Sequence, residues 1–349
     1  MNKRPPRNGE IVEKVQNTLL VDGDALFKLS YFGAKNQYNI NGQHIGGLYQ
    51  FLTILRKALT EDLYHRVYVF WDGRFSGKLR YNIYEAYKSG RGKDYINGTE
   101  PADYAEVNQR RVIQEYLSEM YVRQLEHEFI ETDDFIAYYC LNKNHNEKVT
   151  ILSGDRDFLQ LISDDVRIYF LDLKIYVGLS NYSSYFCFHP DNAVLMKTMI
   201  GDNSDTIKGI KGLGEDTLLS IFPELKTKKM SLSEVIDIAK QKQEERIENK
   251  KKPLKVLSNI INSITDGVQK DRIYEINERL VNLSKPMMTE DGILEIQKLI
   301  EGTLDATGRS LKNVLVLMER DGLDKAIGET RYPEYLIPFK KLIDRENIF

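Results

Sequence analysis

Acidic residues follow several apolar segments of this sequence, at the points where buried strands would end. After the segments LLV, VYVFW and ILSG come Asp22, Asp72, Asp155 and Asp157, and a further acidic segment, ETDD, supplies Glu131, Asp133 and Asp134. A lone aspartate after a strand is often only the N-cap of the next helix, but four such places favour a common site. Ligands of open α/β sheets bind at the carboxyl ends of the strands, where converged carboxylates repel one another unless cations neutralise them. Because hard cations prefer oxygen ligands, the sequence predicts one or two Mg²⁺ sites.

A second acidic cluster, GDNSD, lies directly before a glycine-rich segment. Asp202 and Asp205 are three residues apart, so a helical turn would place both on one face. The segment GIKGLG, which begins at Gly209, predicts a tight turn with outward-facing N–H groups before a helix over 215–221, and such a turn can hold a phosphate. It is not a Walker A loop, because no Gly-Lys-Ser/Thr follows. A plain turn between two helices is the alternative interpretation.

A basic and aromatic stretch follows the second apolar segment. Between residues 74 and 93 six cations face one acid, Glu85, and the aromatic residues Phe75, Tyr81, Tyr84 and Tyr87 lie among them. This mixture suits a nucleic-acid backbone and an unpaired base, although a charge run is often only a solvated face. Residues 100–134 have ten acids and three bases, so charge is segregated along the chain.

The elements that must position these residues alternate between strand and helix. Besides the apolar segments above, residues 166–170 and 174–177 favour strands, and helical periodicity runs through 46–63 and 107–120. This alternation predicts an α/β fold with a largely parallel sheet.

From about residue 189 onward the pattern is helical almost throughout. The charged stretch 226–255 fits a solvated helix pair or a mobile segment. The tail, 331–349, fits a last packed helix or a partner-binding peptide.

Composition excludes several classes of protein. A length of 349 residues suggests about two domains, and a hydrophobic content of 42% excludes a disordered chain. We expect no membrane span and no secretory signal, because there is no apolar run of about 18 residues and the start is polar. Two cysteines and five scattered histidines suggest neither a disulfide framework nor a zinc site. A net charge of −3 does not by itself indicate a nucleic-acid binder.

In this order, the motifs resemble those of the flap endonuclease and 5′→3′ exonuclease family. That family includes the 5′-nuclease domain of bacterial DNA polymerase I and the ribonuclease H of T-even phages. The resemblance covers about residues 18–222 and rests on VDGDA, FWDG, YEAYKSGRG, ETDD, LSGDRDFLQL and GDNSDTIKGIKGLGEDT. A later segment, NERLVNLSKP, is similar to part of the phage enzymes.

The resemblance implies a domain organisation. A polar leader, 1–17, would precede a PIN-like α/β nuclease domain over 18–188, in which about 84–125 would form an arch over the threaded 5′ strand. A helical C-terminal region, 189–349, would begin with a helix–three-turn–helix DNA-binding element at about 190–222.

The resemblance also implies roles for single residues. One divalent ion would lie among Asp22, Asp72, Glu131, Asp133 and Asp155, and a second near Asp157, Asp202 and Asp205, with Asp134 behind these ligands. The basic residues near the scissile phosphate would be Arg80, Lys88 and Arg91, and Tyr87 would stack on the terminal base. Duplex phosphates would lie on the turn, at Lys208, Gly209, Lys211, Gly212 and Gly214, where K⁺ is a further candidate ligand.

The implied activity is that of a structure-specific 5′ nuclease in DNA replication or repair, with RNA primers as a further candidate substrate. Two Mg²⁺ or Mn²⁺ ions can activate a water and stabilise the leaving oxygen, and Lys88, Arg91 and Arg80 would stabilise charge on the phosphate beside Asp155. The expected partners are branched or 5′-ended duplex DNA and RNA–DNA hybrid, and the candidate protein partners are a single-strand-binding protein and a sliding clamp. We expect a monomer in the cytoplasm, which would be the host's if a phage encodes the chain.

Two other interpretations remain open at this point. VDGDA also fits a phosphatase that resembles the haloacid dehalogenase family, in which Asp22 would be a covalent nucleophile and Asp24 an acid or base. A replication or repair protein that binds branched DNA without cleaving it is the alternative outside enzymes. Neither accounts for the whole set of acids together with the basic stretch.

Overall fold

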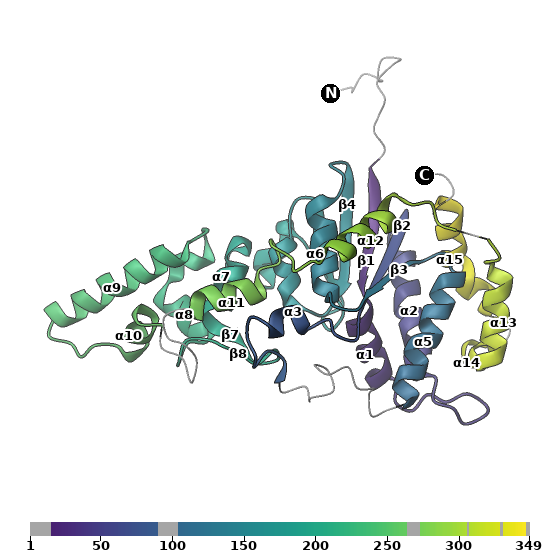
Figure 1. Cartoon of the computed structure of the whole chain (residues 1–349), viewed down its shortest axis with the longest axis horizontal. Coiled ribbons are helices and arrows are strands. Elements are labelled where there is room, and N and C mark those ends of the chain that lie inside the picture. The colour runs from purple at the N-terminus through teal and green to yellow at the C-terminus, as the bar shows by residue number, and fades with distance from the viewer. Residues whose placement is uncertain (1–14, 90–103, 264–272, 306, 329–330, 347–349) are drawn as a thin grey trace, which may run out of the picture.

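The computed structural model describes residues 15–89, 104–263, 273–305, 307–328 and 331–346. Its centre is a six-stranded sheet with the strand order β3-β2-β1-β4-β5-β6 (Figure 1). The strands are β1 (Gln16–Asp22), β2 (Arg66–Asp72), β3 (Arg123–His127), β4 (Glu147–Ser153), β5 (Val166–Phe170) and β6 (Ile175–Val177). The first five are parallel to one another, and β6 is antiparallel to β5. The predicted α/β fold with a largely parallel sheet is confirmed.

The order of the strands reverses between β1 and β4. From β1 the chain adds β2 and β3 on one side, and then β4 and β5 on the other. At such a reversal the connecting loops diverge and leave a crevice at the carboxyl ends of the strands, which is where ligands of these sheets bind. Asp22 lies at that end of β1.

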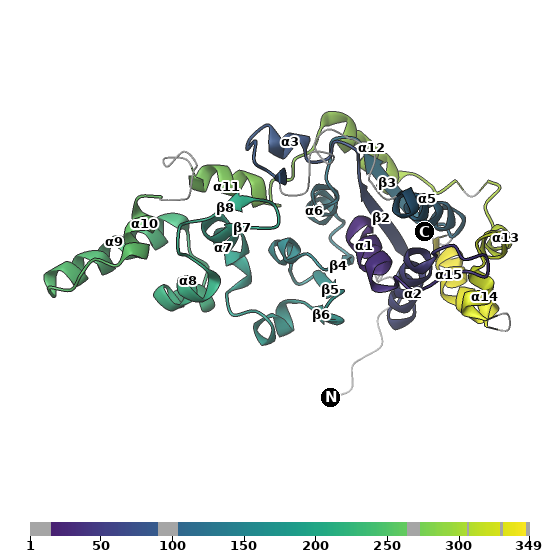
Figure 2. The same cartoon turned by 90° about the horizontal axis from the view of Figure 1, so that it is seen from below.

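Alternate residues of the strands feed two hydrophobic layers, as the twofold period of a strand requires. Leu19 and Trp71 belong to one layer, whereas Leu20 and Phe70 belong to the other. The first layer lies under α1 (Gly23–Gly33), α2 (Gly46–Glu61) and α5 (Tyr104–Glu119), and the second under α6 (Thr132–Asn142). Seen from below in Figure 2, α6 and α7 lie to the left of α1, α2 and α5.

The helical region that follows the sheet is divided between both ends of the molecule. One group extends the second layer away from the sheet: α7 (Ala193–Ile200), α8 (Glu215–Ile221), α9 (Leu232–Glu248), α10 (Lys255–Ile261) and α11 (Ile273–Val281). α12 (Glu290–Glu301) then crosses beside β3. At the other end, α13 (Leu311–Asp321), α14 (Leu323–Ile327) and α15 (Tyr332–Glu346) return to the first layer (Figure 1).

Two sequence expectations about this region are refined by the packing. The last three helices share a hydrophobic core with β1 and β2, so the boundary expected near residue 189 does not separate two independent cores. Of the two interpretations of the tail, the packed helix is confirmed, because Phe339 and Leu342 are fully buried. The charged stretch 226–255, expected as a solvated helix pair or a mobile segment, contains the single helix α9 and the loop that leads to α10, which begins at Lys255.

Of the six strands of the central sheet, five were predicted and one, β3, was missed. β3 has the sequence RQLEH, whose polar side chains do not resemble a buried strand. It lies at the edge of the sheet, where its polar residues can reach solvent or pair with neighbouring side chains. No helix of the described ranges combines the length and hydropathy that a membrane span needs.

The packing of α15 yields a prediction about stability. Phe339 is fully buried in the layer that contains Leu19 and Trp71. Phe339→Ala should therefore lower the free energy of unfolding by about 3–5 kcal/mol, because it removes buried surface and leaves a cavity. Urea unfolding followed by circular dichroism measures the change.

The control is Ile337→Ala on the same helix, because this side chain is 46% exposed. It should change stability by less than about 1 kcal/mol. Equal losses in both variants would contradict the assignment of α15 to the core.

Candidate active site

The carboxyl edge of the sheet brings together acids from separate parts of the chain. Asp22 ends β1, Asp72 ends β2, and Asp155 and Asp157 follow β4. Asp133 lies in the first turn of α6. Carboxylate oxygens of Asp133, Asp155 and Asp157 all lie within 4.8 Å of one another, an arrangement that could hold a metal ion.

Asp22 is held rigidly at the start of this cluster. Its Oδ1 accepts a hydrogen bond from the Ala25 N–H at 3.0 Å and thereby caps α1. Its Oδ2 accepts one from the Ser153 hydroxyl at 2.8 Å, which ties β1 to β4. Burial raises the pKa of Asp22 to about 7, and the charges of Asp72 and Asp155 add to this.

The other acids of the cluster show the same electrostatic conflict. Burial, with Asp155 beside it, raises the pKa of Asp157 to about 7. Burial together with Asp155 and Asp22 raises the pKa of Asp133 well above its usual range. A divalent cation among these oxygens would relieve both the repulsion and the cost of burial. An all-carboxylate donor set fits Mg²⁺ or Mn²⁺.

Asp24 and Arg110 form a support behind Asp72. The Asp72 N–H donates to Asp24 Oδ2 at 2.6 Å, and Arg110 Nε donates to Asp24 Oδ1 at 3.1 Å. Arg110 also donates to the Asp72 carbonyl at 3.0 Å. Asp72 Oδ1 accepts from the Thr132 N–H at 2.8 Å. Both oxygens of Asp24 are engaged, which disfavours the phosphatase interpretation, where Asp24 must exchange protons with a substrate.

Glu131 is neutralised by the protein itself. It forms buried ion pairs with Lys88 and Arg80, and the Tyr87 hydroxyl donates to Glu131 Oε2 at 3.0 Å. Burial alone would raise the pKa of Glu131, but Lys88 and Arg80 lower it to about 2. Glu131 is therefore ionised and already paired with cations.

Two expectations for the basic stretch are corrected by this geometry. Tyr87 is only 3% exposed, so no base can stack on its ring in this conformation, and its hydroxyl positions Glu131. Arg80 is 5% exposed, and donates to Glu131 and Asp134 at 2.5 Å and to the Leu280 carbonyl at 2.9 Å. Its guanidinium thus holds acids in place and is not free to contact a phosphate.

The segment 280–288, which we call the strap, forms hydrogen bonds with residues around Arg80. Asp134 Oδ1 accepts from the Met287 N–H at 2.9 Å. Gln160 donates to the Val281 carbonyl at 2.8 Å, and the Leu283 N–H donates to Gln160 at 3.0 Å. The strap therefore touches the elements that carry Arg80, Asp134 and Asp157.

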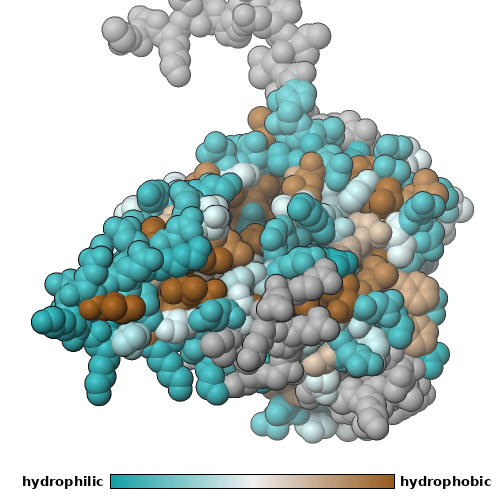
Figure 3. All heavy atoms as spheres, turned by 60° about the vertical axis from the view of Figure 1, so that its left-hand side comes forward, coloured by the Kyte–Doolittle hydropathy of each residue, from teal (hydrophilic) through white to brown (hydrophobic). Residues whose placement is uncertain are grey.

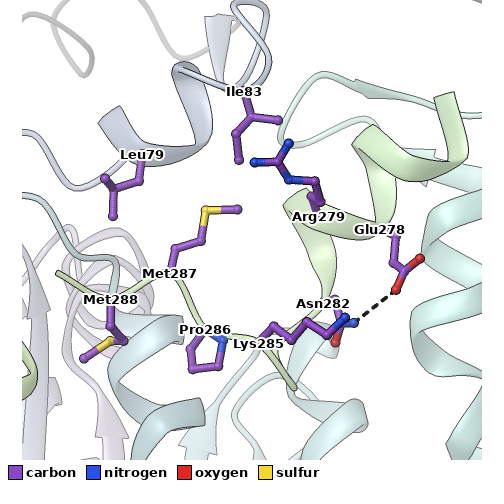
Figure 4. Close-up of a pocket in the computed structure, with 9 residues that line it drawn as sticks. All are labelled: Leu79, Ile83, Glu278, Arg279, Asn282, Lys285, Pro286, Met287 and Met288. Carbon is purple, nitrogen blue, oxygen red and sulfur yellow. Dashed lines mark hydrogen bonds between the residues drawn. The ribbon is translucent and has the colours of Figure 1, made fainter. Parts of the chain in front are cut away.

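The strap, the end of α11 and the segment around the short helix α3 (Lys78–Tyr81) line an open pocket of about 470 Å³. In Figure 4, Leu79 and Ile83 lie on the side of α3, and the Met287 side chain points between them. The Arg279 guanidinium extends toward Ile83.

Lys197, on α7, is a site residue that the sequence interpretation missed. It pairs with Asp157, and its Nζ donates to Asp202 Oδ2 at 2.6 Å. Burial would lower the pKa of Lys197, but Asp157, Asp155 and Asp202 raise it. In turn, Lys197 offsets the effect of burial on Asp202 and lowers its pKa to about 2. The only sign of this role in the sequence was the position of the lysine five residues before Asp202. Because it lies in an otherwise apolar helix, it was not singled out as a site residue.

Asp202 and Asp205 do not lie on one helical face, as their spacing had suggested. Asp202 ends β7 (Gly201–Asp202), and Asp205 lies in the turn that leads to the antiparallel strand β8 (Ile207–Lys208). Asp202 Oδ1 accepts from the Ser204 N–H at 2.7 Å, whereas Asp205 Oδ2 accepts from the Tyr87 hydroxyl at 3.3 Å. The two acids therefore contact different parts of the site, Asp202 beside Lys197 and Asp205 beside Tyr87.

The glycine-rich turn, which begins at Gly209, joins β8 to α8. A side chain at Gly209 would meet the Ile200 carbonyl at 1.8 Å, so only glycine fits there. Gly212 has a φ of +78°, which glycine adopts without strain. Lys208, Lys211, Gly212 and Gly214 are exposed, so this turn can meet a large partner. Arg91 and residues 90–103 of the expected arch, 84–125, lie outside the described residues, whereas residues 104–119 of that segment form α5, which packs in the first hydrophobic layer. Lys88 is described and is 6% exposed.

The comparisons with known proteins agree with this geometry. Residues 17–185 match the family model described as the 5′-3′ exonuclease, N-terminal resolvase-like domain. This match assigns residues 17–185 to the flap endonuclease and 5′-3′ exonuclease family. Six of the predicted acidic ligands lie inside the matched range, and Asp202 and Asp205 lie beyond it.

Relatives with known names support this membership. The chain is 32% identical over 215 residues to the thermostable DNA polymerase I of Thermus caldophilus, a match that covers 61% of this chain and 25% of the polymerase. It is 27% identical over 225 residues to a 5′-3′ exonuclease of Mycoplasmopsis pulmonis, covering 64% of this chain and 70% of that protein. The chain thus spans about a quarter of the length of the polymerases it matches first.

The fold also resembles a solved structure. T5 5′-exonuclease with bound divalent metal ions (zinc) superposes with a TM-score of 0.59 at 17% identity, covering 83% of this chain and 95% of that one. This likeness supports the PIN-like fold, with a resolvase-like α/β domain and a helical C-terminal region.

The position of Lys197 leads to a prediction about metal linkage. Lys197→Met should lower the free energy of unfolding by about 2–3 kcal/mol without metal, because Asp157 and Asp202 lose a partner whose side chain is only 23% exposed. Mg²⁺ should restore more stability in this variant than in the wild type, since a cation can then replace the ammonium group. Thermal melts with and without Mg²⁺ measure both effects.

The control is Lys240→Met, which removes an exposed lysine that pairs with Asp237 on the surface of α9. It should change neither the melting temperature nor its response to Mg²⁺. An equal Mg²⁺ response in wild type and Lys197→Met would show that Lys197 does not compete with a cation.

Proposed function

We propose that this protein is a structure-specific 5′ nuclease that hydrolyses phosphodiesters in DNA replication or repair, as a 5′-3′ exonuclease and flap endonuclease. The observation that carries the proposal is the cluster of Asp133, Asp155 and Asp157 at the carboxyl edge of the sheet. Membership of the family and the remaining acids around this cluster support the same function. The whole acid set also disfavours a DNA-binding protein without catalytic activity.

The proposed cofactors are two Mg²⁺ or Mn²⁺ ions. When bound, two such ions supply an activated water and stabilise the leaving oxygen. Asp22, Asp72, Asp133 and Asp155 would hold the first ion, with Glu131 at its margin. Asp157 and Asp202 would hold the second, with Asp205 nearby.

Lys88 would complete the chemistry at the phosphate. Its ammonium pairs with Glu131, beside the cluster of acids, and its main chain is fixed by a hydrogen bond from its N–H to the Asp205 carbonyl at 2.9 Å. A cation held there can stabilise negative charge that develops on a transferring phosphate. The same role remains a proposal for Arg91.

The proposed DNA contact is the turn between α7 and α8. Lys208, Gly209, Lys211, Gly212 and Gly214 would bind phosphates of a duplex, with K⁺ as a candidate ligand of the turn. Branched or 5′-ended duplex DNA is the proposed substrate, and RNA–DNA hybrid a further one. A single-strand-binding protein or a sliding clamp, a monomeric state and the cytoplasm remain proposals that rest on the sequence.

A panel of labelled substrates tests this function. With Mg²⁺, the protein should shorten or release the 5′ strand of 5′-flap DNA, nicked duplex and RNA-primed duplex. With EDTA it should release nothing, because the carboxylates cannot activate a water without the metal ions. Mapping of the products gives the balance of exonuclease and flap cleavage. Release from 3′ ends, or cleavage in EDTA, would contradict the proposal.

Asp155 provides the sharpest single variant. Asp155→Asn should reduce the rate of cleavage at least about 100-fold, because an amide is a poorer ligand for a hard cation. The fold should survive, since an amide oxygen can still accept the hydrogen bond that the Asp157 N–H donates at 2.7 Å. DNA binding should change little.

The matched control is Asp164→Asn, an exposed aspartate between η2 (Arg156–Leu161) and β5. It should cleave like the wild type. Wild-type turnover by Asp155→Asn would refute the assignment of this cluster as the catalytic centre.

A further inference from the structure

The helix pair of α9 and α10 forms an arm that leaves the molecule beyond the glycine-rich turn. Figures 1 and 2 both show α9 and α10 past α8, at the end of the long axis that is remote from α13–α15. The acidic edge, the turn and this arm therefore follow one another along the molecule. α9 has 17 residues, so its length is about 25 Å.

The arm is attached directly to the turn that we propose as the DNA contact. Asn259 on α10 donates to the Lys211 carbonyl at 2.8 Å. Lys242 on α9 donates to the carbonyl of Ile221, the last residue of α8, at 2.6 Å. These two bonds, with the buried Leu257 and Val235 beneath them, fix the direction of the arm relative to the turn.

The tip of the arm is closed by its own hydrogen bonds. The side chain of Gln243 exchanges two bonds with the main chain of Leu254, at 2.9 Å and 3.2 Å. Arg246 donates twice to the Lys252 carbonyl, at 3.0 Å and 3.2 Å. The loop between the two helices is therefore built on polar anchors and not on apolar packing.

The side chains of this closed tip are strongly basic. Residues 246–255 contain five cations and one acid, Glu248. Lys250, Lys251 and Lys252 are all exposed, and within the described part of the chain their side chains take part in no hydrogen bond or ion pair. Figure 3, which brings the arm forward, shows a largely hydrophilic surface on it. Three unpaired lysines on a loop held by hydrogen bonds can bind a polyanion.

We propose that the tip lysines Lys250, Lys251 and Lys252 bind the phosphate backbone of the duplex DNA beyond the glycine-rich turn. This rests on the proposed function. A duplex whose end lies at the acids and whose backbone crosses the turn would continue along the arm. At 3.4 Å per base pair, an arm of about 25 Å reaches about seven base pairs past the turn. The contact would add affinity without reading sequence, because lysine on phosphate carries no base information.

The test compares flap substrates whose duplex beyond the cleavage point is either about 8 or about 24 base pairs long. Wild type should bind the long substrate more tightly and with a steeper salt dependence. K250Q/K251Q/K252Q should weaken binding of the long substrate about tenfold and reduce its salt slope by about 2.7, which corresponds to three phosphates. On the short substrate, binding and Mg²⁺-dependent cleavage should equal those of the wild type.

The matched control is K312Q/K340Q/K341Q, which removes three exposed lysines from α13 and α15 at the other end of the molecule. It should bind both substrates like the wild type. The proposal is overturned if the tip variant binds the long substrate with an unchanged affinity and slope, or if it loses equal affinity for both lengths. Failure of the proposed function is a separate result, because the wild type would then cleave neither substrate whatever its dependence on length.

Discussion

Repulsion between buried carboxylates is the constraint on which the rest of this structure depends. A parallel sheet delivers the acids that follow its strands to one edge, and burial there makes each charge more costly. The chain meets this cost in three ways. Lys88 and Arg80 neutralise Glu131, Lys197 neutralises Asp157 and Asp202, and the triad of Asp133, Asp155 and Asp157 leaves a place for an added cation.

These ion pairs explain why two cations of the site, Lys88 and Arg80, are buried beside its acids. Lys88 and Arg80 are 6% and 5% exposed, a degree of burial that charged residues reach only with partners. Their first task is to hold Glu131 in place. Lys197 has the corresponding role for Asp157 and Asp202. A metal ion bound there would replace part of the charge neutralisation that Lys197 provides.

Much of the fold was predictable because its signals are local. Apolar runs that end in aspartate identified β1, β2 and β4, and their order identified the edge where the acids meet. The polar strand β3 was missed, because the stability of an edge strand comes from its neighbours and not from its own hydrophobicity. The return of α13–α15 to the first layer was equally invisible, since helical periodicity says which face is buried but not against what. Within the site, residue type and motif located the acids. The pairing of Lys197, the burial of Tyr87 and the hairpin around Asp202 depend on contacts between distant segments, which spacing alone cannot reveal.

The strap has a consequence for the order in which this site can form. Arg80 bonds to a carbonyl 200 residues later in the chain, and Asp134 to an N–H 153 residues later. Contacts of such long sequence separation form late in folding, because a large loop must close before they stabilise anything. During synthesis, all the acids would leave the ribosome well before the strap that braces them. A nascent chain therefore carries the full acidic sequence without the finished site, which is completed only when residues 280–288 have also been made.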